Sequence, residues 1–224
     1  MKQGLSWNKD GERLFEAGLD RGVLYTPGNP GVAWNGLISV AQSPTGGTAQ
    51  AHYIDGVAYY QHTTLEETAG TIQAFTYPDE FMAVGAVLET GDGLFLEQQD
   101  RIPFGLSYRT RVGNDTRGLS HNYRIHLVYN VIATPSTQSN SSLLNAIAPV
   151  NFSWGFVTTP VKVSGRRYTA KIYIDRNRSD PKKFEYLEHI LYGYGRITDP
   201  RMPPLGEVVE LFSPSYVFPG TDAP

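Results

Sequence analysis

The stretch Phe104-Gly-Leu-Ser-Tyr-Arg-Thr-Arg-Val112 decides the fold, because large apolar residues alternate in it with small or charged ones. Side chains of a strand point alternately to its two faces, so Arg109 and Arg111 are expected on one face and the apolar residues on the other. A turn-rich loop, Gly113-Asn-Asp-Thr-Arg-Gly118, follows, and the alternation resumes from Tyr123 to Val131. The two runs predict an antiparallel β-hairpin with one buried face. Since a single hairpin is only marginally stable in water, more strands must support it.

The rest of the chain supplies further strands and one clear helix. Alternating or β-rich runs predict strands over residues 32–40, 71–77, 152–156 and 168–174. A helix is predicted over 180–193, where Asp180 is a good N-cap and Gly193 closes the end, and a short second helix over 205–212. The sequence therefore predicts a mainly β fold, a strand-rich sandwich with a docked helix, in a single domain spanning residues 1–224.

Three segments are expected to lie outside the regular core. Residues 1–31 are interrupted by glycines yet rich in large apolar residues, which predicts an extended N-terminal arm lying on its own core or on a neighbour. Residues 43–69 form a long projecting loop around Tyr53-Ile-Asp-Gly-Val57, where Asp-Gly favours a tight hairpin turn with aromatic flanks. Residues 213–224 are a Pro/Gly tail, and the mixed, glycine-rich run 82–96 gives no clear assignment.

Composition narrows the function classes. The 224 residues contain no cysteine, which excludes disulfides and thiolate zinc sites, and the formal net charge of −3 offers no basic footprint for holding nucleic acid. The first residues lack an apolar signal core and no later run could span a bilayer, so synthesis in the cytosol without export is expected.

No catalytic or metal-binding pattern stands out. His121 and His126 are five residues apart on a strand, which is poor ligand spacing, and the acidic pairs at 66–67 and 79–80 are more typical of a solvated surface than of glycosidase carboxylates. Arg109 and Arg111 are predicted to pair with carboxylates, with 66–67 and 79–80 as candidate partners; a phosphate contact is the less favoured alternative. No cofactor and no enzymatic activity are expected.

Two blocks carry a resemblance to a known family. Glu67-Thr-Ala-Gly-Thr-Ile-Gln-Ala-Phe-Thr-Tyr-Pro-Asp-Glu-Phe81 and Phe104-Gly-Leu-Ser-Tyr-Arg-Thr-Arg-Val-Gly-Asn-Asp115 resemble the major tail tube proteins of bacteriophages with long, non-contractile tails, above all those of actinobacterial phages. Residues 32–36, 190–193 and 199–209 fit the same pattern, so the resemblance covers nearly the whole chain.

The resemblance implies a tail-tube-type β-sandwich with one flanking α-helix, an extended N-terminal arm and a long projecting loop. Such subunits form hexameric rings that stack into a tube, and viral double-stranded DNA passes through its lumen without specific binding. The implied partners are further copies of the chain and the tape measure, tail terminator and distal tail proteins. The implied place is the virion tail, assembled in the host cytoplasm, with no membrane and no catalytic residues.

The residues expected at contacts between subunits are large apolar or charged groups on the arm, the loop and the central hairpin: Trp7, Phe15, Tyr25, Tyr53, Tyr59, Tyr60, Arg109 and Arg111. Two alternatives stay open. The chain could be the ring-forming tube subunit of a secretion or contractile-injection apparatus, or a glycan-binding tail sandwich that uses its exposed aromatic residues.

Overall fold

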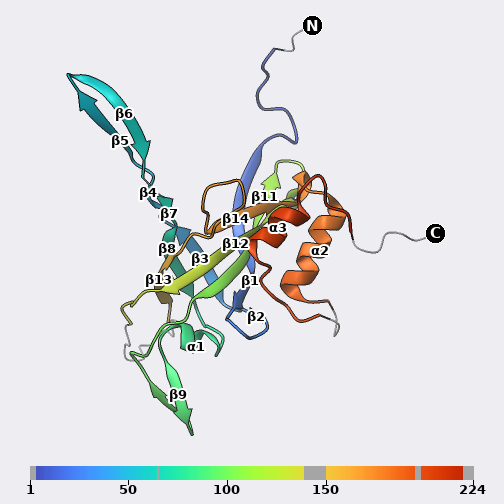
Figure 1. Cartoon of the computed structure of the whole chain (residues 1–224). Helices are drawn as coiled ribbons and strands as arrows, with labels where there is room; N and C mark the ends of the chain where they lie inside the picture. Colours follow the sequence, from blue (N-terminus) through green and yellow to red (C-terminus); the bar gives the residue numbers. More distant parts are fainter. Residues whose placement is uncertain (1–3, 65, 139–149, 195–197, 219–224) are drawn as a thin grey trace, which may run out of the picture.

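The computed structural model describes residues 4–64, 66–138, 150–194 and 198–218, and it is mainly β, with 46% strand and 13% helix. Its main sheet has eight strands, in the order β2-β1-β11-β12-β13-β8-β3, with β14 paired to β12 as well (Figure 1). The bounds of these strands are β1 Leu14–Tyr25, β2 Val32–Ala33, β3 Leu37–Gln42, β8 Ala69–Ala74, β11 Phe104–Asn114, β12 Gly118–Ala133, β13 Phe152–Thr158 and β14 Lys171–Asp175.

The long strand β12 changes its partner along one edge and so folds the sheet into two layers. Residues 124–128 pair with β14, and residues 131–133 pair with β13. Between them lies Asn130, whose φ of 47° is in the left-handed region that asparagine tolerates better than most residues. A bend at such a position is how a strand passes from one layer to another. The sandwich predicted from the sequence is therefore one continuous sheet, folded at Asn130.

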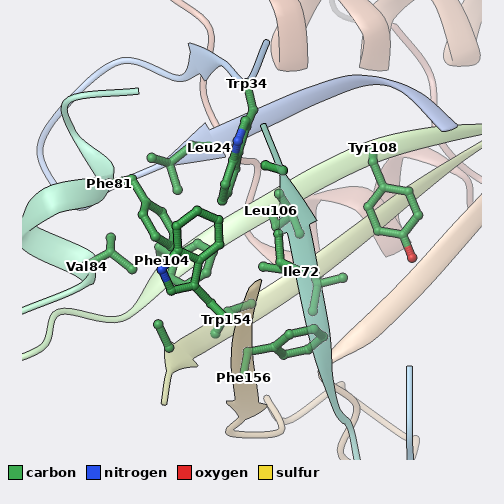
Figure 2. Packing of buried hydrophobic residues seen from close by; sticks show 14 residues of the cluster. Leu24, Trp34, Ile72, Phe81, Val84, Phe104, Leu106, Tyr108, Trp154 and Phe156 are labelled. Atoms are coloured by element: carbon green, nitrogen blue, oxygen red, sulfur yellow. The ribbon is translucent and has the colours of Figure 1, made fainter. Parts of the chain in front are cut away.

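The first core cluster fills the space between the two layers (Figure 2). Leu106 and Val128 come from one layer, and Ile72 and Trp154 from the other. The short helix α1, Phe81–Val84, adds Phe81, whose ring lies 4.7 Å from Trp34 and 4.8 Å from Trp154 between ring centroids. The aromatic side chains thus close one end of the layered core.

The outer face of the first layer is also buried, which corrects the prediction that the central hairpin has one buried face. Ile125 lies opposite Arg109 and Leu127 opposite Ser107, so these two apolar residues of the second run share the face predicted to be polar. Two helices cover that face, α2 Pro181–Tyr192 and α3 Leu205–Leu211, and form a second core cluster on it. Alternation predicts which residues of one strand share a face. The register between two strands also depends on bulges, which alternation does not reveal.

The helices begin and end close to where the sequence predicts. The Asp180 carboxylate accepts hydrogen bonds from the backbone N–H groups of Lys182 and Lys183, and Pro181 occupies the first helical position. Gly193, with a φ of 77°, follows the last helical residue of α2. The predicted second helix is confirmed as α3.

The N-terminal arm is only partly confirmed. Residues 4–13 run outside the body, but β1, Leu14–Tyr25, is an inner strand between β2 and β11. Two irregular positions interrupt its period: Gly18 has a φ of 75° and Arg21 a φ of 49°, and the register with β11 shifts at both places. An irregular arm over residues 1–31 is therefore wrong for its second half.

The sequence left residues 82–96 without an assignment, and the predicted tail is described only in part. The run 82–96 contains the end of α1 and a second small hairpin, β9 Leu88–Gly91 with β10 Leu94–Leu96. The predicted 213–224 tail is described only to residue 218, and there Tyr216 and Phe218 pack on the helix-covered cluster. The polar Ser/Thr/Asn run at 134–142 lies partly outside the described residues.

Candidate assembly surfaces

Three extensions leave the body and expose large apolar side chains (Figure 1). They are the ribbon of β5 Ala49–Ile54 and β6 Val57–Thr63, the β9–β10 hairpin, and the segment of residues 4–13. A two-stranded ribbon buries little of its own surface, so apolar residues on it gain burial only from another molecule. These extensions are the strongest candidates for contact surfaces.

The β5–β6 ribbon confirms the predicted Asp-Gly hairpin within the loop 43–69. Asp55 and Gly56 have φ values of 50° and 78°, as a tight turn with two positive φ angles requires. Tyr53, Tyr59 and Tyr60 are all exposed, and Tyr59 keeps 77% of its surface. The short pair β4 Thr45–Gly46 and β7 Glu66–Glu67 carries the ribbon away from the body.

One side of this ribbon is a stack of rings. The ring centroid of His62 lies 5.5 Å from that of His52 and 5.6 Å from that of Tyr60. Such stacking stiffens the ribbon, which keeps an exposed aromatic surface in one orientation for a partner.

The β9–β10 hairpin is a contact candidate that the sequence analysis missed. Its turn, Asp92-Gly93, has φ values of 47° and 76°, and Leu88, Leu94, Phe95 and Leu96 are exposed on its strands. The dipeptide Asp-Gly was the signal that could have found it, as it did for the ribbon.

The segment of residues 4–13 ends in a small hydrogen-bonded anchor. The Gly11 N–H donates to Asp115 Oδ1 at 2.9 Å, and Asn114 Nδ2 donates to the Gly11 carbonyl at 3.1 Å. Beyond the anchor, Trp7 keeps 76% of its surface. Phe15 lies at the start of β1 and is half exposed, with its ring over Gly113 so closely that a Cβ there would lie 2.4 Å from Phe15 Cζ.

Tyr25 is not a contact residue, which corrects the sequence prediction. Its side chain is 5% exposed, and its hydroxyl donates to the Leu191 carbonyl at 2.8 Å. The same oxygen lies 3.2 Å from Ser107 Oγ. Tyr25 therefore joins β1 to helix α2 inside the chain.

Arg109 and Arg111 do pair with a carboxylate, but the partner is Asp20 and not the acidic pairs 66–67 or 79–80. Arg109 Nε and Nη2 donate to the two Asp20 oxygens at 2.5 and 2.8 Å, and Arg111 Nε donates to Oδ2 at 2.9 Å. The hydrogen bonds from Arg109 hold the pKa of Asp20 below its usual value. The Arg109 guanidinium also lies 4.4 Å from the centroid of the Tyr123 ring. Arg109 is thus a buried structural residue, and only Arg111 keeps a partly exposed head.

Arg124, on the second strand of the hairpin, is also neutralised within the chain. It lies between Glu16 and Asp175, and its Nε donates to Asp175 Oδ2 at 2.9 Å. Arg109, Arg111 and Arg124 therefore offer no strong anion site.

The described residues show no arrangement suited to metal chemistry, since no group of three or more His, Asp or Glu side chains gathers in them. His126 is buried against Tyr108, with ring centroids 4.8 Å apart, and its Nε2 lies 2.8 Å from Thr110 Oγ1. Burial lowers the pKa of His126 to about 4, and Lys171 and Arg124 contribute to the shift. This histidine is part of the core.

Of the helices in the described residues, none combines the length and the hydropathy that crossing a bilayer requires. Comparison of the sequence with models of protein families finds no matching family, and comparison with curated proteins finds no matching relative. The arrangement of the chain itself therefore carries the functional argument.

Proposed function

We propose that this chain is the structural subunit of a bacteriophage tail tube. Copies assemble into hexameric rings, and the rings stack into a tube in the virion tail whose lumen conducts the viral DNA during ejection. The observation that carries the proposal is the set of exposed apolar extensions on a well-packed body. The resemblance of residues 67–81 and 104–115 to tail tube proteins supplies the identity of the assembly.

The extensions favour a protein that completes its fold by assembly. The β5–β6 ribbon alone exposes five large apolar residues, which therefore add nothing to the core of the subunit: Tyr53, Ile54, Val57, Tyr59 and Tyr60. Singly exposed apolar residues are common on monomers, but a whole ribbon of them is typical of an interaction site.

The edges of the first layer favour ring closure. Asp20, Arg109, Ile125 and Ile174 lie side by side across β1, β11, β12 and β14, so β1 and β14 lie on opposite sides of the same layer. In the described residues, no strand pairs with the other edge of β1 over residues 14–20, and β14 pairs only with β12. Open edges attract further strands, and a ring that pairs one edge with the other leaves none open.

Electron microscopy of the purified chain in negative stain tests the proposal. Hollow rings or tubes of uniform diameter are expected. A chain that stays small at high concentration would contradict it and favour a glycan-binding protein. A tube of a secretion or injection apparatus would also polymerise, and a gene for a very long helical tape-measure protein nearby would favour the phage tail.

The ribbon can be tested separately, because its two ends meet. The Ser43 N–H donates to the Ala69 carbonyl at 2.8 Å, so a short turn can replace residues 44–68 without disturbing β3 or β8. This variant should fold and fail to form tubes. Replacing Tyr53, Tyr59 and Tyr60 by serine should have a similar effect, whereas Tyr194→Ser, at a comparably exposed tyrosine on the body, should leave tube formation unchanged.

A further inference from the structure

Charge is distributed very unevenly along this chain. Residues 79–100 contain six acidic residues and no lysine or arginine, whereas residues 162–183 contain eight basic residues and two acidic ones. The whole chain has 22 acidic and 19 basic residues, so its near balance conceals two segments of opposite sign.

The acidic segment is exposed and not neutralised within the described residues. It covers the start of α1, the β9–β10 hairpin and the turn that follows. Every acid in it is exposed and none forms an ion pair in the described part of the chain: Asp79, Glu80, Glu89, Asp92, Glu97 and Asp100. We call this surface the acidic end.

The basic segment is equally unpaired. Its two acids are already occupied, because Asp175 pairs with Arg124 and Asp180 caps helix α2. Six of its basic residues are exposed and form no ion pair in the described ranges: Lys162, Arg166, Arg167, Arg176, Arg178 and Lys182. These residues flank the edge strand β14, and we call them the basic belt.

Figure 1 separates the two surfaces in space. The β9–β10 hairpin and α1 lie at the lower end of the molecule, whereas β14 crosses its upper part. Some charges of the body are paired within the chain, as Arg109 and Arg111 are with Asp20. The acidic end and the basic belt, by contrast, are two separated surfaces of opposite sign whose charges form no ion pair in the described residues.

We propose that the acidic end of one copy docks on the basic belt of a second copy, in the same orientation. Two acidic ends, or two basic belts, repel each other, so the charges exclude contacts between like surfaces and favour contacts between unlike ones. With both copies in the same orientation, such a contact is head-to-tail. A head-to-tail contact that does not close on itself repeats without limit, which gives a stack with one direction. The inference rests on the proposed function, for which it names the contact between successive rings.

The acidic end also has an apolar centre, so burial of apolar surface adds to the attraction between charges at the proposed contact. Leu94, Phe95 and Leu96 are exposed on the same hairpin as Glu89 and Asp92. An apolar centre with a charged rim is the usual composition of a protein interface. The charges select the partner surface and the apolar centre stabilises the contact once it forms.

Two neutralised variants of the full chain test the docking. Variant A carries Glu89→Gln, Asp92→Asn, Glu97→Gln and Asp100→Asn, and variant B carries Lys162→Gln, Arg166→Gln, Arg176→Gln and Arg178→Gln. All eight side chains are exposed and outside ion pairs in the described residues, so unchanged circular dichroism and melting are expected to show that both variants fold. At low salt, variant A and variant B should each raise the protein concentration needed for stacking by about tenfold or more, because several weak ion pairs are lost at every contact between rings.

The equimolar mixture of A and B gives the decisive result. A retains the basic belt and B the acidic end, so the mixture should form complexes of one A ring and one B ring that do not grow, measured by light scattering after size-exclusion chromatography. About 1 M salt should dissolve them, since the Debye length is then about 3 Å. A control with two neutralised acids on the body, outside every proposed contact surface, Asp199→Asn and Glu210→Gln, should stack like the unmodified chain.

The outcomes separate the two proposals. If the unmodified chain forms tubes and A and B form them equally well, the docking is wrong and the tail-tube proposal stands. If the unmodified chain never assembles, both are wrong. If A and B do not associate, and a short duplex DNA binds the unmodified chain and A but not B, the basic belt is a nucleic-acid surface and the docking is overturned.

Discussion

Asp20 neutralises two arginines at once, and its place in β1 explains how. The irregular positions at Gly18 and Arg21 flank it and turn its carboxylate toward both Arg109 and Arg111. Arg109 has a side chain only 10% exposed, while that of Arg111 is 43% exposed. Losing the carboxylate leaves a buried charge in the first case and a solvated one in the second.

We therefore predict that Asp20→Ala destabilises the chain by about 3–5 kcal/mol, whereas Arg111→Ala costs about 0–1 kcal/mol. Urea unfolding of the unassembled chain measures both. Combining Asp20→Ala with Arg109→Leu should recover part of the loss, because the buried charge then disappears. Equal costs for the two single variants would show that Arg109 is not the buried partner assumed here.

His126 should make stability depend on pH between about 6.5 and 4. Its pKa is about 4 in the folded chain, mainly because of burial, and about 6.5 in an unfolded one. Within this window the unfolded chain binds more protons, so stability falls as the pH falls, by about 3 kcal/mol in total. The carboxylate of Asp20, whose pKa is lowered, adds its own loss only as the pH falls below about 4.

The check is to measure melting temperature against pH for the unmodified chain and for His126→Phe. The variant retains a ring beside Tyr108 and should lose most of the slope between pH 6.5 and 4. His52→Gln, on the exposed ribbon, should retain the slope. A slope that is the same in all three proteins would assign the pH dependence to other groups.

At the scale of single residues, the sequence predicted that Arg109 and Arg111 pair with carboxylates, but it did not identify Asp20 as the partner. Like charges on neighbouring positions of one face require a counter-charge, and that much follows from alternation. Asp20 lies 89 residues from Arg109 in sequence, on a strand whose period the glycines obscure. Tyr25 was predicted to be exposed for the same reason: the sequence predicts an extended arm over residues 1–31, whereas Tyr25 lies at the buried end of strand β1.

At the scale of elements, β1 turns the N-terminal region from an appendage into part of the core. Leu24 belongs to the cluster between the layers, and Val23 and Tyr25 belong to the cluster under the helices. A chain without its first 30 or so residues is therefore not expected to fold. Only the part before β1 can be removed.

We predict that deleting residues 1–12 leaves stability nearly unchanged, with a loss of about 1 kcal/mol from the anchor at Gly11. Deleting residues 1–25 should abolish cooperative unfolding, because it removes an inner strand from the sheet. Circular dichroism during thermal unfolding distinguishes the two. A cooperative transition in the longer deletion would mean that β1 is dispensable.

Asn130 is the point where the sheet folds over, and its backbone conformation is specific to few residues. Asn130→Gly should be tolerated to within about 1 kcal/mol, because glycine adopts positive φ without a clash. Asn130→Val should cost about 2 kcal/mol more than glycine, since a branched side chain clashes in that region. Urea unfolding compares the two, and the glycine variant controls for the weak hydrogen bond from Nδ2 to the Thr159 carbonyl. Equal stability of the two variants would show that the bend does not require this conformation.

Most elements were within reach of the sequence, and the relations between them were not. Asp180 and Gly193 mark helix α2 through local chemistry, and the Asp-Gly turn marks the β5–β6 ribbon in the same way. Register, by contrast, is set by bulges and by what packs on each face, so the covering of the second face by α2 and α3 could not be read from alternation. The partner change along β12 depends on one residue, Asn130, inside an otherwise regular strand.

At the scale of the whole molecule, stability and assembly use different parts of the chain. The core of the body is held by contacts within the chain, as Asp20 with Arg109 and Tyr25 with Leu191 illustrate. The β5–β6 ribbon and the β9–β10 hairpin keep their large apolar side chains exposed, and the charges of the acidic end and the basic belt form no ion pair in the described residues. A chain divided in this way can fold first as a single subunit and then assemble through preformed surfaces, which keeps the ordering cost at assembly small.

Hydrogen exchange in the unassembled and assembled chain should therefore change in the extensions and little in the body. Amides of residues 49–63 and 88–96 exchange fast in the single subunit, because small exposed ribbons open readily. In the tube a neighbour should cover both, and protection should rise by about tenfold or more, since every 1.4 kcal/mol of added stability is a factor of ten. Amides of β11 and β12 already lie between covered faces and should change far less. Uniform protection along the whole chain would mean that folding and assembly are one event, and unchanged exchange in residues 49–63 would show that the ribbon is not a contact surface.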